Sequence, residues 1–155
     1  NSMGAGIWGS AFFAIFALMI IISRPLVGKV YARYRSKFII YPGLGLFILG
    51  LFGLGLATTP MAIILTAPLL GLGYGAAQPA FQALAIQSAP IERAGVSTAT
   101  YFLALDISVG AGSIILALLA NALGYQYLYI IAALVMVIAL SLYHVWIKKY
   151  TPLEI

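Results

Sequence analysis

Asp106 is the acidic residue best placed to do chemistry, because it is the only acid within a long apolar segment of the chain. The 155-residue sequence has three acids, and Asp106 lies ten residues after Val96, where that segment begins. If the segment crosses a membrane, a carboxylate at this depth is costly and usually faces a protein interior or a water-filled path. Asp106 is therefore a candidate to bind and release a proton or a cation. The alternative is a structural acid that is hydrogen-bonded to a neighbouring helix and never changes its protonation state.

Two amide side chains lie inside another apolar segment, which runs from Met61 to about Gln87. Gln78 and Gln82 are four residues apart, so a helix places both on the same face. Amides in such a position can hydrogen-bond a polar ligand, or they can bond across a packed interface between helices. We interpret Gln78, Gln82 and the nearby Tyr74 as candidates to line a cavity, with bonding between helices as the alternative.

Small residues share the faces that carry these polar groups. Gly71 and Gly75 continue the stripe of the two glutamines, and Gly110 and Ser113 continue the stripe of the buried acid. Because small residues let two helices approach closely, these four positions predict helix packing. Pro79 has no amide hydrogen and should bend its helix, so we count it with them.

The remaining reactive residues are too few for a metal site or an enzyme. The sequence contains no Cys and a single His, His144, which we interpret as a side chain at the membrane boundary. One buried acid cannot form an aspartyl dyad, and no His or Cys accompanies a nucleophile at membrane depth. We therefore expect no catalytic residue, no metal and no cofactor, and an intramembrane enzyme is the weakest alternative.

The composition indicates that the elements carrying these residues are surrounded by lipid. Hydrophobic residues make up 64% of the chain and charged residues 7%, whereas an average soluble domain has about 25% charged residues. The net charge of +5 comes from basic residues that flank apolar runs and do not follow one polar face. Their placement favours the membrane surface as their partner and argues against nucleic acid.

Five apolar segments are long enough to cross a bilayer, which needs roughly 20 residues of helix. We predict an all-α, polytopic membrane protein in which residues 1–155 form a single helical bundle. Pro60 suits the start of the third helix, and Gly124 with Asn121 marks a tight turn before the fifth. The predicted spans are residues 7–23, 38–57, 61–87, 96–120 and 127–147.

The basic residues orient these spans, because Lys and Arg are retained in short cytoplasmic loops. All eight lie on one side of a five-span arrangement, and the gaps on the other side have no charge. The pattern predicts an outside N-terminus and a cytoplasmic C-terminus. The basic residues are Arg24, Lys29, Arg33, Arg35, Lys37, Arg93, Lys148 and Lys149.

Four stretches carry a family resemblance. They are residues 23–29 (SRPLVGK), 71–79 (GLGYGAAQP), 89–95 (APIERAG) and 105–112 (LDISVGAG). In this order they resemble the C-terminal half of major facilitator superfamily transporters, and most of all the bacterial drug:proton antiporter branch. The resemblance implies that the five spans correspond to helices eight to twelve of a twelve-helix carrier, with helix seven and the N-terminal half absent.

The segment after the first span resembles the cytoplasmic loop signature of that family, a Gly followed by an Asp-Arg pair and a basic cluster. Gly28, Arg33 and Lys37 match it, and we include Arg24, which precedes it. Ala32 replaces the acid of the signature, so a gating ion pair built on that acid is in doubt. Orientation and contact with lipid headgroups are the alternative roles of these charges.

The resemblance also implies a function. We expect part of a secondary active transporter in the bacterial cytoplasmic membrane that exports a small molecule or drug by proton-coupled alternating access, with Asp106 as the proton-coupling residue. Its expected partners are the lipid bilayer, the missing N-terminal half of the same carrier and a small-molecule substrate. The alternative is a self-contained oligomeric membrane channel or scaffold protein.

Overall fold

Five long helices make up the computed structural model, which describes residues 2–33 and 37–150 and the side-chain surroundings of residues 6–29 and 38–145. A short 3-10 helix, η1 (Ile91–Arg93), precedes the fourth long helix. The prediction of an all-helical fold with five long apolar helices is confirmed. The long helices are α1 (Ser2–Arg33), α2 (Lys37–Leu56), α3 (Pro60–Gln87), α4 (Ala94–Leu123) and α5 (Tyr125–Tyr150).

Each long helix of the described chain contains a stretch long and apolar enough to cross a membrane. The first such stretch is Gly6–Lys29, and α1 itself continues to Arg33, ten residues beyond the predicted span of 7–23. Pro25 lies inside α1 and does not end it. The helix ends do not define the bilayer boundaries, so the bilayer limits of each span stay predictions.

The turns follow local backbone chemistry. Thr59 caps α3, where its side-chain oxygen accepts a hydrogen bond from the backbone amide of Ala62 at 3.2 Å, and Pro60 occupies the first turn. Gly124 separates α4 from α5 with a φ of +87°, a region that favours glycine. Both turn predictions are confirmed, whereas Asn121 lies within α4 and not in the turn.

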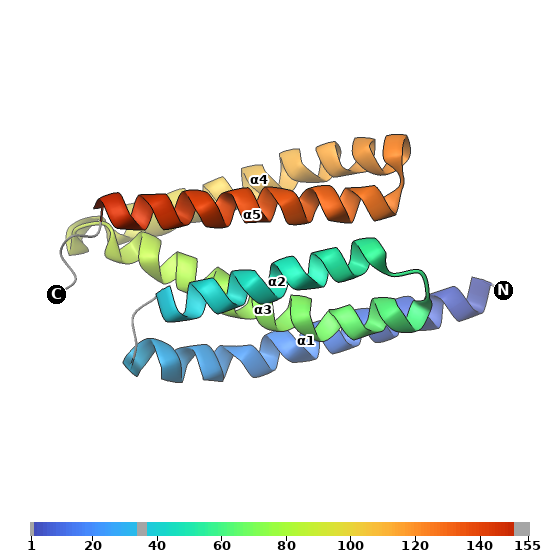
Figure 1. Ribbon diagram of the computed structural model, residues 1–155. Coiled ribbons are helices and arrows are strands. Elements are labelled where there is room, and N and C mark those ends of the chain that lie inside the picture. Colours follow the sequence, from blue (N-terminus) through green and yellow to red (C-terminus); the bar gives the residue numbers. More distant parts are fainter. Residues whose placement is uncertain (1, 34–36, 151–155) are drawn as a thin grey trace.

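Helix α3 is the centre of the bundle and packs most extensively against α2 and α1. Helix α2 also packs against α5, while α4 makes smaller contacts with α3 and α5. Figure 1 shows α1 beginning and α5 ending at opposite ends of the bundle, as five passes in alternating directions require.

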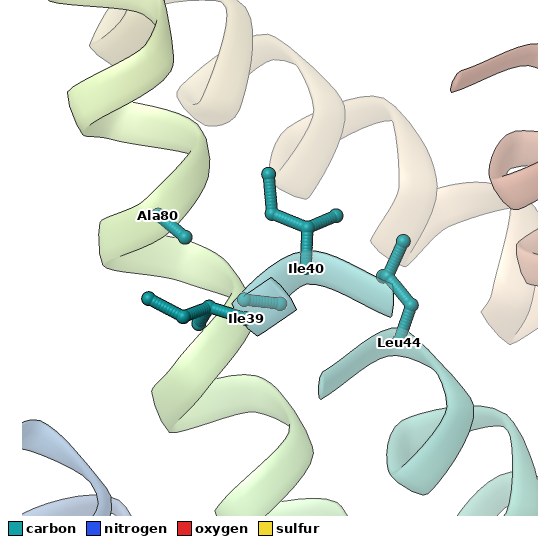
Figure 2. Close-up of a cluster of buried hydrophobic side chains, with 5 residues drawn as sticks. Ile39, Ile40, Leu44 and Ala80 are labelled. Atoms are coloured by element: carbon teal, nitrogen blue, oxygen red, sulfur yellow. The ribbon is translucent and has the colours of Figure 1, made fainter. Parts of the chain in front are cut away.

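The buried core lies between α2 and its neighbours α3 and α5. Ile39, Ile40 and Leu44 of α2 cluster with Ala77 and Ala80 of α3, and Figure 2 shows Ala80 beside the α2 side chains. A second cluster extends the core toward α5 and contains Leu51, Leu54, Leu70 and Ala133. In contrast, α4 contains no buried residue, so the bundle is closed around α2 and α3 and open along α4.

Candidate functional site

A hollow of about 640 Å³ lies between α1, α3 and α4, and three of the polar residues identified from sequence, Arg24, Gln78 and Gln82, line it. Its volume falls within the range of roughly 300–1,000 Å³ that is typical of small-molecule sites. Gln78, Gln82 and Pro79 come from α3, and Arg24 and Gly28 come from α1. The full lining consists of Arg24, Val27, Gly28, Gln78, Pro79, Gln82, Ala83 and Phe102.

Close packing of α1 on α3 brings together the two walls of this hollow that carry polar side chains, Arg24 on α1 and the two glutamines on α3. A Cβ atom at Gly75 would collide with the hydroxyl of Ser23 and would lie 3.0 Å from Cα of Ile20. A Cβ atom at Gly71 would lie 2.6 Å from the carbonyl oxygen of Phe16, so both glycines of the stripe allow close approach of α1. Because Arg24 follows Ser23 in the chain, this contact places Arg24 beside the hollow.

Helix α4 forms the third wall of the hollow and is attached to α3 by two hydrogen bonds. The hydroxyl of Tyr101 donates to the backbone carbonyl of Gln78 at 3.2 Å, and the hydroxyl of Ser97 donates to the carbonyl of Ala85. These bonds place Phe102, which follows Tyr101, at the edge of the hollow. Sequence reasoning did not identify these α4 residues, although the four-residue spacing of Ser97 and Tyr101 marks one helical face.

The hollow carries a positive charge. Arg24 is the only charged residue in its lining, and the two glutamines are neutral. A guanidinium group stays protonated in proteins and offers five N–H donors, while each amide offers two. The lining can therefore donate several hydrogen bonds toward one ligand, but it has no acidic side chain to attract a cation.

Asp106 lies outside this hollow, on the same helix as Phe102 and four residues further along. That spacing puts the carboxylate one turn beyond Phe102 on nearly the same face of α4. Asp106 is exposed within the described chain. Nothing lies within 4 Å of the Cβ position of Gly110, and the exposed Ser113 bonds back to the carbonyl of Gly110 at 2.8 Å. No described helix therefore packs on this face of α4, and packing at Gly110 and Ser113 stays a prediction.

Tyr74 is separated from the two glutamines. Its side chain is 39% exposed, and its ring centroid lies 6.3 Å from that of Phe16 and 6.2 Å from that of Phe47. It thus contacts rings of α1 and α2 and does not line the hollow with Gln78.

The residues of the loop signature lie on helices and not in a loop. Arg24 and Gly28 belong to the last turns of α1 and line the hollow. Arg33 ends α1 and Lys37 begins α2, but their side chains lie outside the described residues. The backbone is helical at Arg24 and Gly28, which lie within the apolar stretch Gly6–Lys29, and their role in a cytoplasmic loop signature stays a prediction.

His144 joins two helices at the end of the bundle where α5 finishes. Its Nδ1 atom lies 2.8 Å from the hydroxyl oxygen of Tyr41, a residue of α2 that is 103 positions away. The rings of Tyr41 and Tyr143 meet edge to face at 5.6 Å. Sequence reasoning placed His144 at the membrane boundary without this partner. Within the described residues, no group of three or more His, Cys, Asp or Glu could hold a metal ion.

Comparison with known proteins identifies relatives over nearly the whole chain. The family described as Major Facilitator Superfamily matches residues 5–154. The uncharacterized MFS-type transporter YhhS of Escherichia coli O6:H1 is 33% identical over 109 residues, which are 70% of this chain and 26% of that protein. YhhS of Salmonella enteritidis PT4 is 27% identical over 147 residues, which are 94% of this chain and 36% of that protein. The chain thus spans between a quarter and about a third of the length of these relatives. No solved structure matches it.

Proposed function

The chain belongs to the Major Facilitator Superfamily, and from this membership we propose that it is part of a secondary active transporter that exports a small molecule by proton-coupled alternating access. The family and the relatives are membrane transporters and not enzymes, and the protein is an integral membrane protein with bacterial homologues. A bilayer and a substrate are therefore its natural partners. Our proposal adds the direction of transport, the coupling ion and the residues involved.

The chain supplies the second half of the carrier in this proposal. The four sequence stretches that resemble the C-terminal half support this assignment. The alternating distribution of basic residues supports a cytoplasmic location for the end at which α1 finishes and α2 begins. A match to part of a longer carrier favours this reading over a self-contained oligomeric channel or scaffold.

The substrate path in this proposal runs along the hollow between α1, α3 and α4. The single observation that supports it is that Gln78, Gln82 and Arg24 line one cavity of about 640 Å³, although they come from two different helices. In alternating access, one bundle of helices moves against the other around such a site. The N-terminal half would close the hollow from the open side, along α4.

Asp106 is the proton-coupling residue of this proposal. It lies one turn from Phe102 on nearly the same face of α4, and that face has no described helix against it. When the N-terminal half covers this face, the carboxylate lies between the two halves near the middle of the membrane. An ionisable side chain within a membrane-spanning helix marks a proton or ion pathway by default, which supports this role for Asp106.

Replacing Asp106 by Asn in the full-length transporter tests the proposal. In proteoliposomes that contain the Asp106→Asn variant, a proton gradient should no longer drive substrate transport. The variant should be expressed at the normal level and have normal thermal stability. Ser108→Ala on the same helix is the matched control, because the Ser108 hydroxyl bonds only to the carbonyl of Ala104 among the described contacts. Gradient-driven transport at the normal rate in the Asp106→Asn variant would make this carboxylate a structural group.

A further inference from the structure

The charges around the hollow restrict what it can bind. Its lining has one guanidinium group and two amides and contains no acid. Of the acids in the described residues, Asp106 lies beyond Phe102 on α4, and Glu92 lies in η1 outside the lining. A cationic ligand would meet the positive charge of Arg24 without a compensating carboxylate. The electrostatics of the hollow therefore favour a ligand with negative charge.

Arg24 also needs an anion once the hollow is closed. The residue lies within the apolar stretch Gly6–Lys29, five residues before its end. A guanidinium group cannot lose its proton in a protein, and removing it from water without a partner is costly. In the proposed transport cycle, on which this inference rests, the N-terminal half covers the hollow. An anionic group on the ligand would then replace the water that Arg24 loses.

The donors in the hollow are of the kinds that bind an oxyanion. The planar guanidinium fork binds a carboxylate or a phosphate through two parallel hydrogen bonds. Gln78 and Gln82 lie on the facing helix and can add amide N–H donors. The contact of Gly75 with Ser23 holds these two sets of donors at the same cavity, because it brings α1 and α3 together beside the hollow.

The rest of the lining is apolar. Val27, Pro79, Ala83 and Phe102 form the walls around the three polar side chains. A small inorganic anion would leave this apolar surface uncovered, whereas an amphipathic molecule would cover it. We propose that the hollow binds the oxyanion group of an amphipathic molecule through Arg24, Gln78 and Gln82, with the apolar part of the molecule against Phe102 and Val27. The oxyanion can belong to a free organic acid or to a lipid headgroup.

A pair of fluorescent ligands that differ only in charge tests this proposal. Dansylglycine carries a carboxylate, and dansylglycinamide is its uncharged counterpart. Binding is measured with the full-length transporter in neutral maltoside micelles, where no anionic lipid competes. We expect dansylglycine to bind more tightly than the amide. We expect Arg24→Gln to weaken dansylglycine binding by about tenfold or more, the loss expected for a hydrogen bond to a charged group, and to leave amide binding unchanged.

Two further variants separate this role from folding and from general surface charge. Arg24→Lys keeps the charge but not the planar fork, so we expect it to restore part of the affinity that Arg24→Gln loses. Lys29→Gln removes a positive charge one turn further along α1, outside the lining of the hollow, and should bind dansylglycine like the wild type. Equal binding of acid and amide, or equal losses in Arg24→Gln and Lys29→Gln, would overturn the proposal.

Added phosphatidylglycerol identifies the source of the oxyanion. If this lipid displaces dansylglycine from the wild-type protein, the hollow accepts a lipid headgroup. If dansylglycine stays bound, the hollow prefers a free organic acid. Absence of dansylglycine binding in lipid-free micelles would refute the oxyanion site altogether. These measurements need no proton gradient, so failure of the proposed proton coupling would leave them unaffected, and the reverse also holds.

Discussion

Gly75 lies so close to Ser23 that a Cβ atom on the glycine would collide with the serine hydroxyl. Ser23 is 3% exposed, and its hydroxyl donates to the carbonyl of Ile20 within α1 at 2.8 Å. The contact thus joins the backbone of α3 directly to α1. Because Arg24 follows Ser23 and Gln78 lies three residues after Gly75, this contact brings the two polar walls of the hollow together.

Gly75→Ala should therefore weaken the packing of α1 on α3. The new methyl group meets the Ser23 side chain and the Ile20 backbone, and overpacking of this kind costs about 1–3 kcal/mol. We expect a lower midpoint of thermal unfolding in detergent. Gly45→Ala is the matched control, since nothing lies within 4 Å of its Cβ position. Equal stability of the two variants would mean that α1 does not pack on α3 at Gly75.

Tyr101→Phe should loosen α4 from α3. The variant keeps the aromatic ring but loses the hydrogen bond from the Tyr101 hydroxyl to the carbonyl of Gln78. Such bonds between membrane helices contribute about 0.6 kcal/mol on average, so we expect a small decrease in thermal stability. Tyr127→Phe removes a hydroxyl from a side chain that is 61% exposed and should have no effect. A Tyr101→Phe protein as stable as Tyr127→Phe would contradict this attachment of α4.

The hydrogen bond between Tyr41 and His144 should couple α2 to α5. A double-mutant cycle with Tyr41→Phe and His144→Ala measures the coupling, because the phenylalanine keeps the ring contact with Tyr143. We expect a coupling free energy of about 0.5–1.5 kcal/mol in thermal or denaturant unfolding. Tyr125→Phe, at a side chain that is 71% exposed, should show no coupling to His144→Ala. Additive effects of Tyr41→Phe and His144→Ala would show that the bond does not form in the membrane protein.

The two ends of α3 should lie on opposite sides of the membrane. The alternating basic residues predict that Thr58 lies outside and Ser88 in the cytoplasm. In a full-length transporter without other cysteines, Thr58→Cys should react with an impermeant maleimide added to intact cells, and Ser88→Cys should react only after permeabilisation. Labelling of Ser88→Cys and not Thr58→Cys in intact cells would reverse the proposed orientation.

Sequence reasoning predicts the helices of this protein better than their contacts. Pro60 and Gly124 mark two turns through local backbone preferences that need no knowledge of the fold. The face of each helix that packs inward is harder to predict, because the helices are apolar nearly all round and a lipid-facing residue resembles a core residue.

The hollow shows the same limit. Gln78 and Gln82 share a face through their spacing alone, so sequence reasoning finds them as a pair. Arg24 joins them only because α1 packs on α3, and Tyr41 meets His144 across 103 positions of sequence. Tyr74 lies close to the two glutamines in the chain, but its ring packs against Phe16 and Phe47. The surroundings of Arg24, His144 and Tyr74 all depend on which helices pack against each other. No local sequence pattern predicts that packing.

If the hollow is the substrate path, it opens to water beside Gln78 during the transport cycle. Cysteine accessibility at Gln78 tests it directly in the full-length transporter without other cysteines. Leu142→Cys is the control, because Leu142 is 65% exposed on α5, lies at a similar distance from its helix end and does not line the hollow. We predict that a small water-soluble maleimide labels Gln78→Cys, that reversing the proton gradient changes the labelling rate, and that Leu142→Cys stays unreactive. A Gln78→Cys protein as unreactive as Leu142→Cys under both gradients would contradict the account.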